Sequence, residues 1–165
     1  MIRTFLAAVL FTISTAGGIA QTYPGQGTDL TIMVGLNAPG VGSQASTLVA
    51  SPSDLLYVTI DSPLGVADFQ PMALFAEFRF SPPVATGFPG VWLDLQNGFI
   101  VNLTPSSLPG SLGVPVLPQG NSFLWQFPPN ALASTIHLVL QAYALTPPSV
   151  SALGYLSTDA VDILF

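Results

Sequence analysis

Short runs in which every second residue is apolar recur along the chain, and Pro, Gly, Ser or Asn residues separate them. Between residues 30 and 36 the alternate positions hold Leu, Ile, Val and Leu, and between residues 56 and 60 they hold Leu, Val and Ile. A period of two indicates a strand with one buried face. Further runs of this period occupy residues 72–80, 123–127 and 136–144. The pattern predicts an all-β fold, a single-domain antiparallel β-sandwich of jelly-roll or Ig-like type with about eight or nine short strands.

The first residues follow a different pattern. Arg3 supplies a positive charge, Phe5–Ile13 are mostly apolar, and Gly18-Ile19-Ala20 are small or apolar. This order predicts a signal peptide over residues 1–20, cut before Gln21, and one β-sandwich domain over residues 21–165. No later run is long and apolar enough to cross a bilayer as a helix. We therefore expect an exported bacterial protein that is secreted, periplasmic or held at the cell surface.

One hairpin is predicted in detail, in the run VWLDLQNGFIV. A two-residue Asn-Gly turn would put Phe99 on the same face as Trp92, whereas a three-residue loop over residues 96–98 pairs Leu95 with Phe99. Since a slip of one residue moves every side chain to the other face, the apolar pattern favours the three-residue loop, which also pairs Leu93 with Val101. The predicted core face is Val91, Leu93, Leu95, Phe99, Val101 and Leu103, and the predicted outward face is Trp92, Asp94, Ile100 and Asn102.

Charge is scarce and mostly acidic. Charged residues make up 6% of the chain and the net charge is −6, against a usual charged share of about a quarter. Arg79 is the only basic residue after Arg3, and lysine is absent. Nucleic-acid binding and binding to anionic lipid are excluded, because both need clustered Lys and Arg. The chain has no cysteine, so stability must come from burial and backbone pairing. We expect Asp54, Asp61, Asp68, Asp159 and Asp162 to lie at the surface and to solvate it.

His137 is the only histidine. Parity places it on a strand face with Val139, Gln141 and Tyr143, opposite a more apolar face. A Ser-His-Asp site would need a serine at a strained turn, and the chain has no Gly-x-Ser-x-Gly motif. Because the chain has no cysteine or lysine, catalysis by a thiol or through a Schiff base is excluded. We therefore interpret His137 as a structural residue.

The sequence does not support catalysis by a pair of carboxylates either. Glu77 is the only glutamate, and Arg79 lies two residues along the same strand face, so the two are expected to form an ion pair. Such a pair lowers the pKa of Glu77, which is the wrong direction for the acid of a glycosidase. The aspartates lack the spacing of a calcium loop. The sequence predicts no enzyme, no metal site and no cofactor.

Trp92 is the candidate for ligand binding. On its predicted face the ring lies with Asp94 and Asn102, as a ring that stacks on a sugar would. Glycan binding through Trp92, Asp94 and Asn102 is therefore one alternative function. Trp125, between Phe123 and Phe127, is expected in the core.

A second alternative is a small outer-membrane β-barrel, since the chain ends in Val161, Ile163 and Phe165 at alternate positions. The favoured function is a secreted, non-catalytic structural or interaction module. Edge strands are usually guarded by charge, which this chain almost lacks, so we expect self-association or docking on another cell-surface protein.

The C-terminal third also carries a resemblance. FPPNALASTIHLVLQAYAL followed by SALGYLSTDAVDILF resembles the closing segment of a large group of uncharacterised secreted β-sandwich domains in planctomycete-type bacteria. In that pattern an apolar strand ending in Gln-Ala precedes a Pro-rich turn and a last strand. Gly87-Phe88-Pro89-Gly90 is similar to a turn of the group, whereas Ser157-Thr158-Asp159 departs from its usual Ser-Asn. The resemblance covers the last half of the chain, implies a β-sandwich fold and an exported location, and transfers no catalytic residue.

Overall fold

A computed structural model describes residues 23–26, 29–39, 47–96, 98–104, 115–117, 123–127 (backbone only) and 136–165. Within these ranges the chain is all-β, and no helix is long and apolar enough to cross a membrane. The strands are β1 (Thr31–Leu36), β2 (Thr47–Val49), β3 (Leu56–Asp61), β4 (Met72–Arg79), β5 (Phe99–Asn102), β6 (Phe123–Phe127), β7 (His137–Leu145), β8 (Tyr155–Ser157) and β9 (Val161–Leu164).

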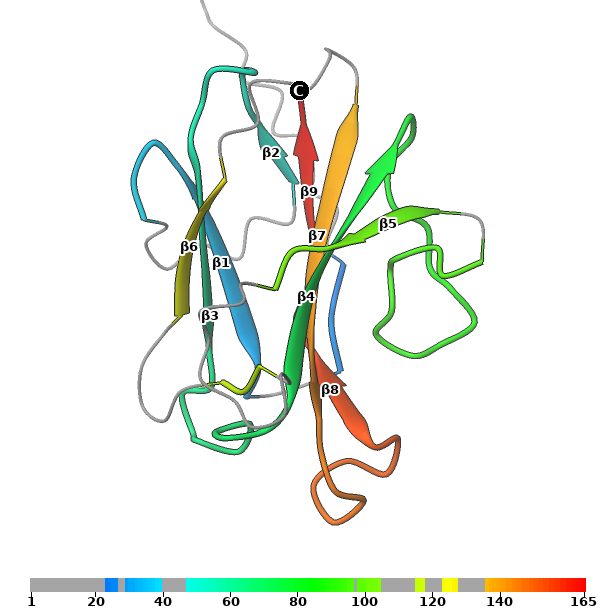
Figure 1. The fold of residues 1–165 in the computed structure, drawn as a ribbon. Helices are drawn as coiled ribbons and strands as arrows, with labels where there is room; N and C mark the ends of the chain where they lie inside the picture. Colours follow the sequence, from blue (N-terminus) through cyan, green and yellow to red (C-terminus); the bar gives the residue numbers. More distant parts are fainter. Residues whose placement is uncertain are drawn as a thin grey trace, which may run out of the picture.

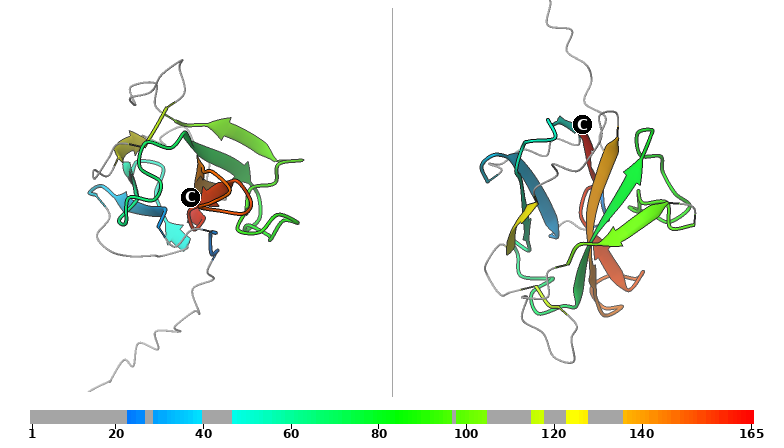
Figure 2. Two further views of the ribbon diagram at one scale, coloured as in Figure 1. Left: turned by 90° about the horizontal axis from the view of Figure 1, so that it is seen from below. Right: turned by 45° about the horizontal axis from the view of Figure 1, so that its top comes forward.

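The strands form two sheets that face each other (Figure 1). The three-stranded sheet has the order β1-β3-β6 and is antiparallel throughout. The six-stranded sheet has the order β2-β9-β7-β4-β5, with β8 pairing with β7 as well. Its pairs are antiparallel except β2–β9, which is parallel. Figure 2 shows the same two layers from other sides.

The main core lies between the two sheets and takes side chains from both. The alternate apolar positions of β1 and β3 point into it, as the sequence predicts: Ile32 is 5% exposed, and Leu56, Val58 and Ile60 are completely buried. The six-stranded sheet contributes its inner face, which includes Met72, Leu74, Ala76, Leu138, Leu140, Ala142, Ala144, Val161 and Ile163. β6 confirms the strand predicted at residues 123–127, but the core position expected for Trp125 lies outside the described side chains.

The outer face of the six-stranded sheet is covered as well. A second, smaller apolar cluster forms there around Tyr23, Leu93, Val139 and Ala160. Tyr23 lies close to β9, because its carbonyl accepts the Ala160 N–H at 2.9 Å. Leu93 belongs to residues 90–94, which we call the covering segment. Consequently β7 is buried on both faces over most of its length.

The predicted hairpin is wrong. Residues 91–96 form no strand, and β5 instead pairs with β4, with Phe99 opposite Phe78. Val91 and Leu93 are buried as expected, but Leu95 and Phe99 are 59% and 70% exposed. The reason lies in side chains distant in sequence, which bind the backbone of the covering segment and remove it from any ladder.

Candidate functional site

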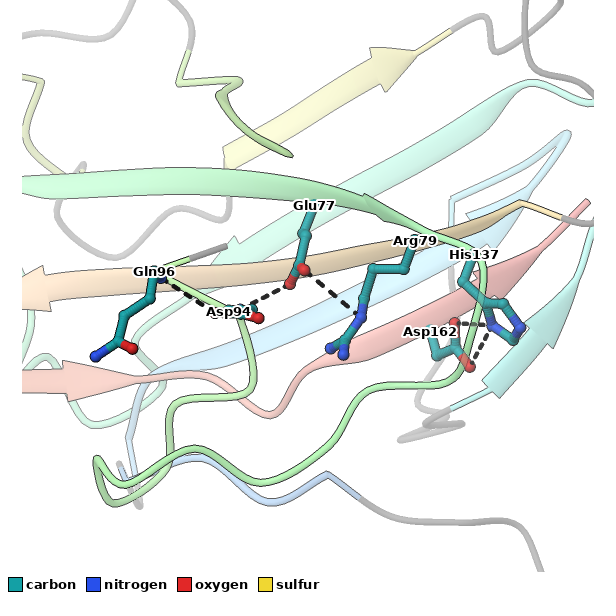
Figure 3. A network of polar contacts seen from close by, with 6 residues as sticks. All are labelled: Glu77, Arg79, Asp94, Gln96, His137 and Asp162. Atoms are coloured by element: carbon teal, nitrogen blue, oxygen red, sulfur yellow. Dashed lines mark hydrogen bonds and ion pairs between the residues drawn. The ribbon is translucent and has the colours of Figure 1, made fainter. Parts of the chain in front are cut away.

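Four ionisable side chains form a row on the outer face of the six-stranded sheet (Figure 3). The row follows from strand register: Arg79 on β4 is opposite His137 on β7, and β9 brings Asp162 beside them. Glu77 is on the same face of β4, two residues before Arg79. Glu77 is 2% exposed and Asp162 is 1% exposed. Three of the ten Asp, Glu and Arg residues of the chain, Glu77, Arg79 and Asp162, thus lie together on one covered face.

Glu77 fastens the covering segment to β4. Its Oε2 accepts the backbone N–H of Asp94 at 2.8 Å, and its Oε1 lies 3.5 Å from Nε of Arg79. The expected ion pair with Arg79 is therefore confirmed. The expected direction of the pKa is wrong: burial raises the pKa of Glu77, and the Asp94 N–H and the charge of Arg79 lower it by less. Sequence spacing revealed the partner but not the depth of burial.

His137 and Asp162 join β7 to β9. Nδ1 of His137 lies 2.8 Å from Oδ1 and 3.1 Å from Oδ2 of Asp162. Burial raises the pKa of Asp162, although the hydrogen bond and charge of His137 oppose this. The face predicted for His137, shared with Gln141 and Tyr143, is confirmed by the register of β7 with β4. A carboxylate that orients an imidazole is one part of a general-base site; within the described residues the imidazole of His137 is hydrogen-bonded to Asp162.

Gln141, in the middle of β7, lies on the same face. Its Oε1 accepts the backbone N–H of Trp92 at 3.0 Å and the hydroxyl of Tyr143 at 2.6 Å. Its Nε2 donates to the carbonyls of Gly90 at 2.6 Å and Thr158 at 2.8 Å. The side chain is completely buried, so all four hydrogen bonds are needed to satisfy the amide. The strand parity predicted this face for Gln141, but no partner for it.

The three predicted ligand residues do not form one site. Trp92 is part-buried: its indole packs edge-on against Tyr23 with ring centroids 5.2 Å apart, and its Nε1 donates to the carbonyl of Pro24 at 2.9 Å. Asp94 lines a pocket together with Arg79. Asn102, on β5, accepts hydrogen bonds from the N–H and hydroxyl of Thr104. Glycan binding centred on Trp92 stays a prediction, without a shared cavity to support it.

Two hollows lie on this face, at opposite ends of β4. The Arg79 pocket has a volume of about 280 Å³ and is lined by Arg79, Val84, Ala85, Thr86, Gly87, Phe88, Leu93, Asp94, Leu95 and Gln96. The Asn102 groove has a volume of about 390 Å³ and is lined by Pro71, Met72, Ala73, Phe75, Asn102, Thr104, Pro115, Tyr143 and Leu145. The first is the more polar, since it contains a guanidinium, a carboxylate and an amide.

Asp162 is buried, contrary to the expectation that it lies at the surface, and so is Asp29. Asp29 is 2% exposed and accepts hydrogen bonds from the hydroxyl of Ser62 and from the N–H groups of Leu64 and Val66. Burial alone would raise the pKa of Asp29, but these hydrogen bonds outweigh it and the pKa is lowered. Asp29 therefore fixes the turn between β3 and β4. No three His, Asp or Glu side chains gather as a metal site in the described part of the chain.

No family model matches this sequence, and no curated protein or solved structure is significantly similar to it.

Proposed function

We propose that the protein is an exported, non-catalytic β-sandwich of jelly-roll or Ig-like type that acts as an interaction module and associates with further copies of itself. The signal-peptide pattern of residues 1–20 and the resemblance to secreted planctomycete-type domains support a secreted, periplasmic or cell-surface location. A structural use of the buried ionisable groups supports a non-catalytic role. Glu77 and Gln141 bind the backbone of the covering segment, and His137 is hydrogen-bonded to Asp162.

The observation that carries self-association is an exposed aromatic edge. β5 is the last strand of the six-stranded sheet. Phe99, at its start, is 70% exposed, and Phe80, directly after the neighbouring β4, is 89% exposed. Large aromatic side chains at this exposure favour contact with another surface. None of the four residues of β5 is charged, so the usual protection of an edge by charge is missing.

The distribution of charge allows a second copy to approach at this edge. The chain carries a net charge of −6, so two copies repel each other over most approaches. An edge without charged side chains is where that repulsion is weakest. The edges of the six-stranded sheet are only three residues (β2) and four residues (β5) long, and short edges limit backbone pairing. Aromatic burial, rather than strand addition, therefore supplies most of the contact.

Sedimentation velocity tests this proposal. The protein purified after export, without detergent, is expected to form discrete larger species as its concentration rises. Phe80→Ser and Phe99→Ser should each weaken the association by about tenfold, since each removes a buried aromatic contact. Phe69→Ser is the matched control, because Phe69 is 60% exposed in the turn between β3 and β4. A wild type that stays monomeric throughout would contradict the proposal, as would equal loss in all three variants.

A further inference from the structure

We propose that the Arg79 pocket binds one ring of a neutral carbohydrate, held by Arg79 and Gln96 and stacked on Phe88. Neither Phe80 nor Phe99 lines this pocket, although Arg79 directly precedes Phe80, and the inference goes beyond the proposed self-association. The site also differs from the glycan site predicted from the sequence, because Trp92 does not line this pocket.

The pocket suits one small ring in size and composition. Ligand pockets have volumes of about 300–1,000 Å³ and combine apolar walls with a few polar groups. At about 280 Å³ the Arg79 pocket lies just below that range, so it has room for one small ring only. Its apolar lining includes Val84, Phe88 and Leu95, which are 65%, 58% and 59% exposed. A sugar ring has an apolar C–H face that can pack on such a wall and hydroxyl groups at its edge.

Hydrogen bonds within the protein hold one wall of the pocket in place. The hydroxyl of Thr86 donates to the carbonyl of Val91 at 2.7 Å and accepts the N–H of Phe88 at 3.2 Å. The N–H of Val91 donates to the carbonyl of Phe88 at 3.2 Å, which closes the turn. Phe88 is thus presented by a hydrogen-bonded turn and not by an unsupported loop. A ligand would lose little binding energy in ordering it.

Arg79 has hydrogen-bonding capacity that the protein does not use. Its guanidinium has five N–H donors, yet its ion pair with Glu77 is long, at 3.5 Å, and its Nη1 has no hydrogen-bond partner in the structure as described. The side chain is 15% exposed and lines the pocket. Because Nη1 is itself buried, the guanidinium has to rotate on binding to turn this donor towards a hydroxyl oxygen of the ligand. Gln96 adds an exposed amide that both donates and accepts.

Local charge favours a neutral ligand over an anion. Arg79 is the only cation lining the pocket, and Asp94 lines it too. The Glu77 carboxylate lies 3.5 Å from Nε of Arg79. A phosphate or carboxylate would approach one positive group flanked by two acids, in a chain of net charge −6. Hydroxyl groups gain hydrogen bonds from the same side chains without this repulsion.

The test is a titration of the exported protein, observed by saturation-transfer NMR and calorimetry, with the methyl glycosides of glucose, galactose, mannose and N-acetylglucosamine. We expect at least one of them to bind in the millimolar range. Phe88→Ala should weaken that binding about fivefold through lost stacking, and Gln96→Ala about fivefold through a lost hydrogen bond. Both side chains are exposed, so both variants should fold. Phe69→Ala, which removes an equally exposed ring elsewhere, should leave binding unchanged.

Three results would overturn the inference: no binding of any of the four glycosides, binding that Phe88→Ala and Gln96→Ala leave intact, or tighter binding of inorganic phosphate than of every glycoside. The last would identify an anion site. Because Phe88→Ala and Gln96→Ala leave Phe80 and Phe99 in place, their sedimentation should match that of the wild type. Failure of sugar binding and failure of self-association are therefore distinguishable.

Discussion

The two faces of the six-stranded sheet are both buried, but different interactions bury them. The inner face is a continuous apolar layer, in which Leu74 and Leu138 are completely buried against the other sheet. On the outer face Glu77, Gln141 and Asp162 are buried to the same degree. Apolar contact is non-directional and fixes little beyond which side is inside. Buried hydrogen bonds need particular partners, so the outer face determines where the covering segment lies.

The largest effect is expected from the inner face. Leu74→Ala leaves a cavity beneath the facing sheet, and such changes usually lower the free energy of unfolding by about 2–5 kcal/mol. Urea unfolding at constant pH measures this loss. An effect below that of an exposed substitution, such as Leu153→Ala at 48% exposure, would show that the two sheets do not share a close-packed core.

Gln141→Leu tests the outer face with little change in volume. The substitution leaves the Trp92 N–H and the Thr158 carbonyl without their partner, and it leaves the Gly90 carbonyl with the Ser157 hydroxyl as its remaining donor. Burying such groups unpaired should lower the free energy of unfolding by about 2–3 kcal/mol. The same urea experiment measures it. If Gln141→Leu is neutral, the outer face is held by apolar contact alone and the contrast between the two faces disappears.

Asp162→Asn is expected to have a smaller effect that depends on pH. Burial raises the pKa of Asp162 above its ordinary value of 3.8. The folded state then binds this proton more tightly than the unfolded chain does, so the group stabilises most below pH 3.8 and loses that contribution as the pH rises through the folded pKa. Asn does not titrate. The free energy of unfolding of the wild type minus that of Asp162→Asn should therefore fall as the pH rises.

Urea unfolding of the two proteins at a series of pH values, from below 3.8 to neutral, measures this difference in the free energy of unfolding. Glu77, whose pKa burial also raises, is present in both proteins and cancels in the difference. A difference that rises with pH would mean that the charge of His137 outweighs the burial of Asp162.

Sequence pattern was sufficient where one face of a strand meets the main core. The runs at residues 30–36 and 56–60 correspond to β1 and β3, and the alternation within each run correctly predicts which side chains are buried. The same is true of the inner face of β7, at Leu138 and Leu140. In these strands a single local signal, the period of two, reports a single physical cause, burial of one face.

The pattern gave a wrong prediction where the residues that bury a segment are distant from it in sequence. Val91 and Leu93 alternate like strand residues and are buried, but they pack on the outer face of the sheet from a non-strand segment. The cause is that Glu77 and Gln141, 17 and 49 residues away from their partners, bind the backbone of Asp94 and Trp92. The local pattern of apolar residues cannot predict contacts between residues so distant in sequence. For the same reason Asp162, which is 1% exposed, was expected at the surface.

The central claim is that buried polar side chains fasten the covering segment to the sheet. Native-state hydrogen exchange of the Trp92 and Asp94 amides, resolved by NMR, tests it most directly. Both amides donate to buried side chains, so the account predicts protection comparable to that of backbone amides within β7. It also predicts that Gln141→Leu selectively removes the protection of Trp92. Rapid exchange of both amides in the wild type, at the rate of an exposed loop, would contradict the account.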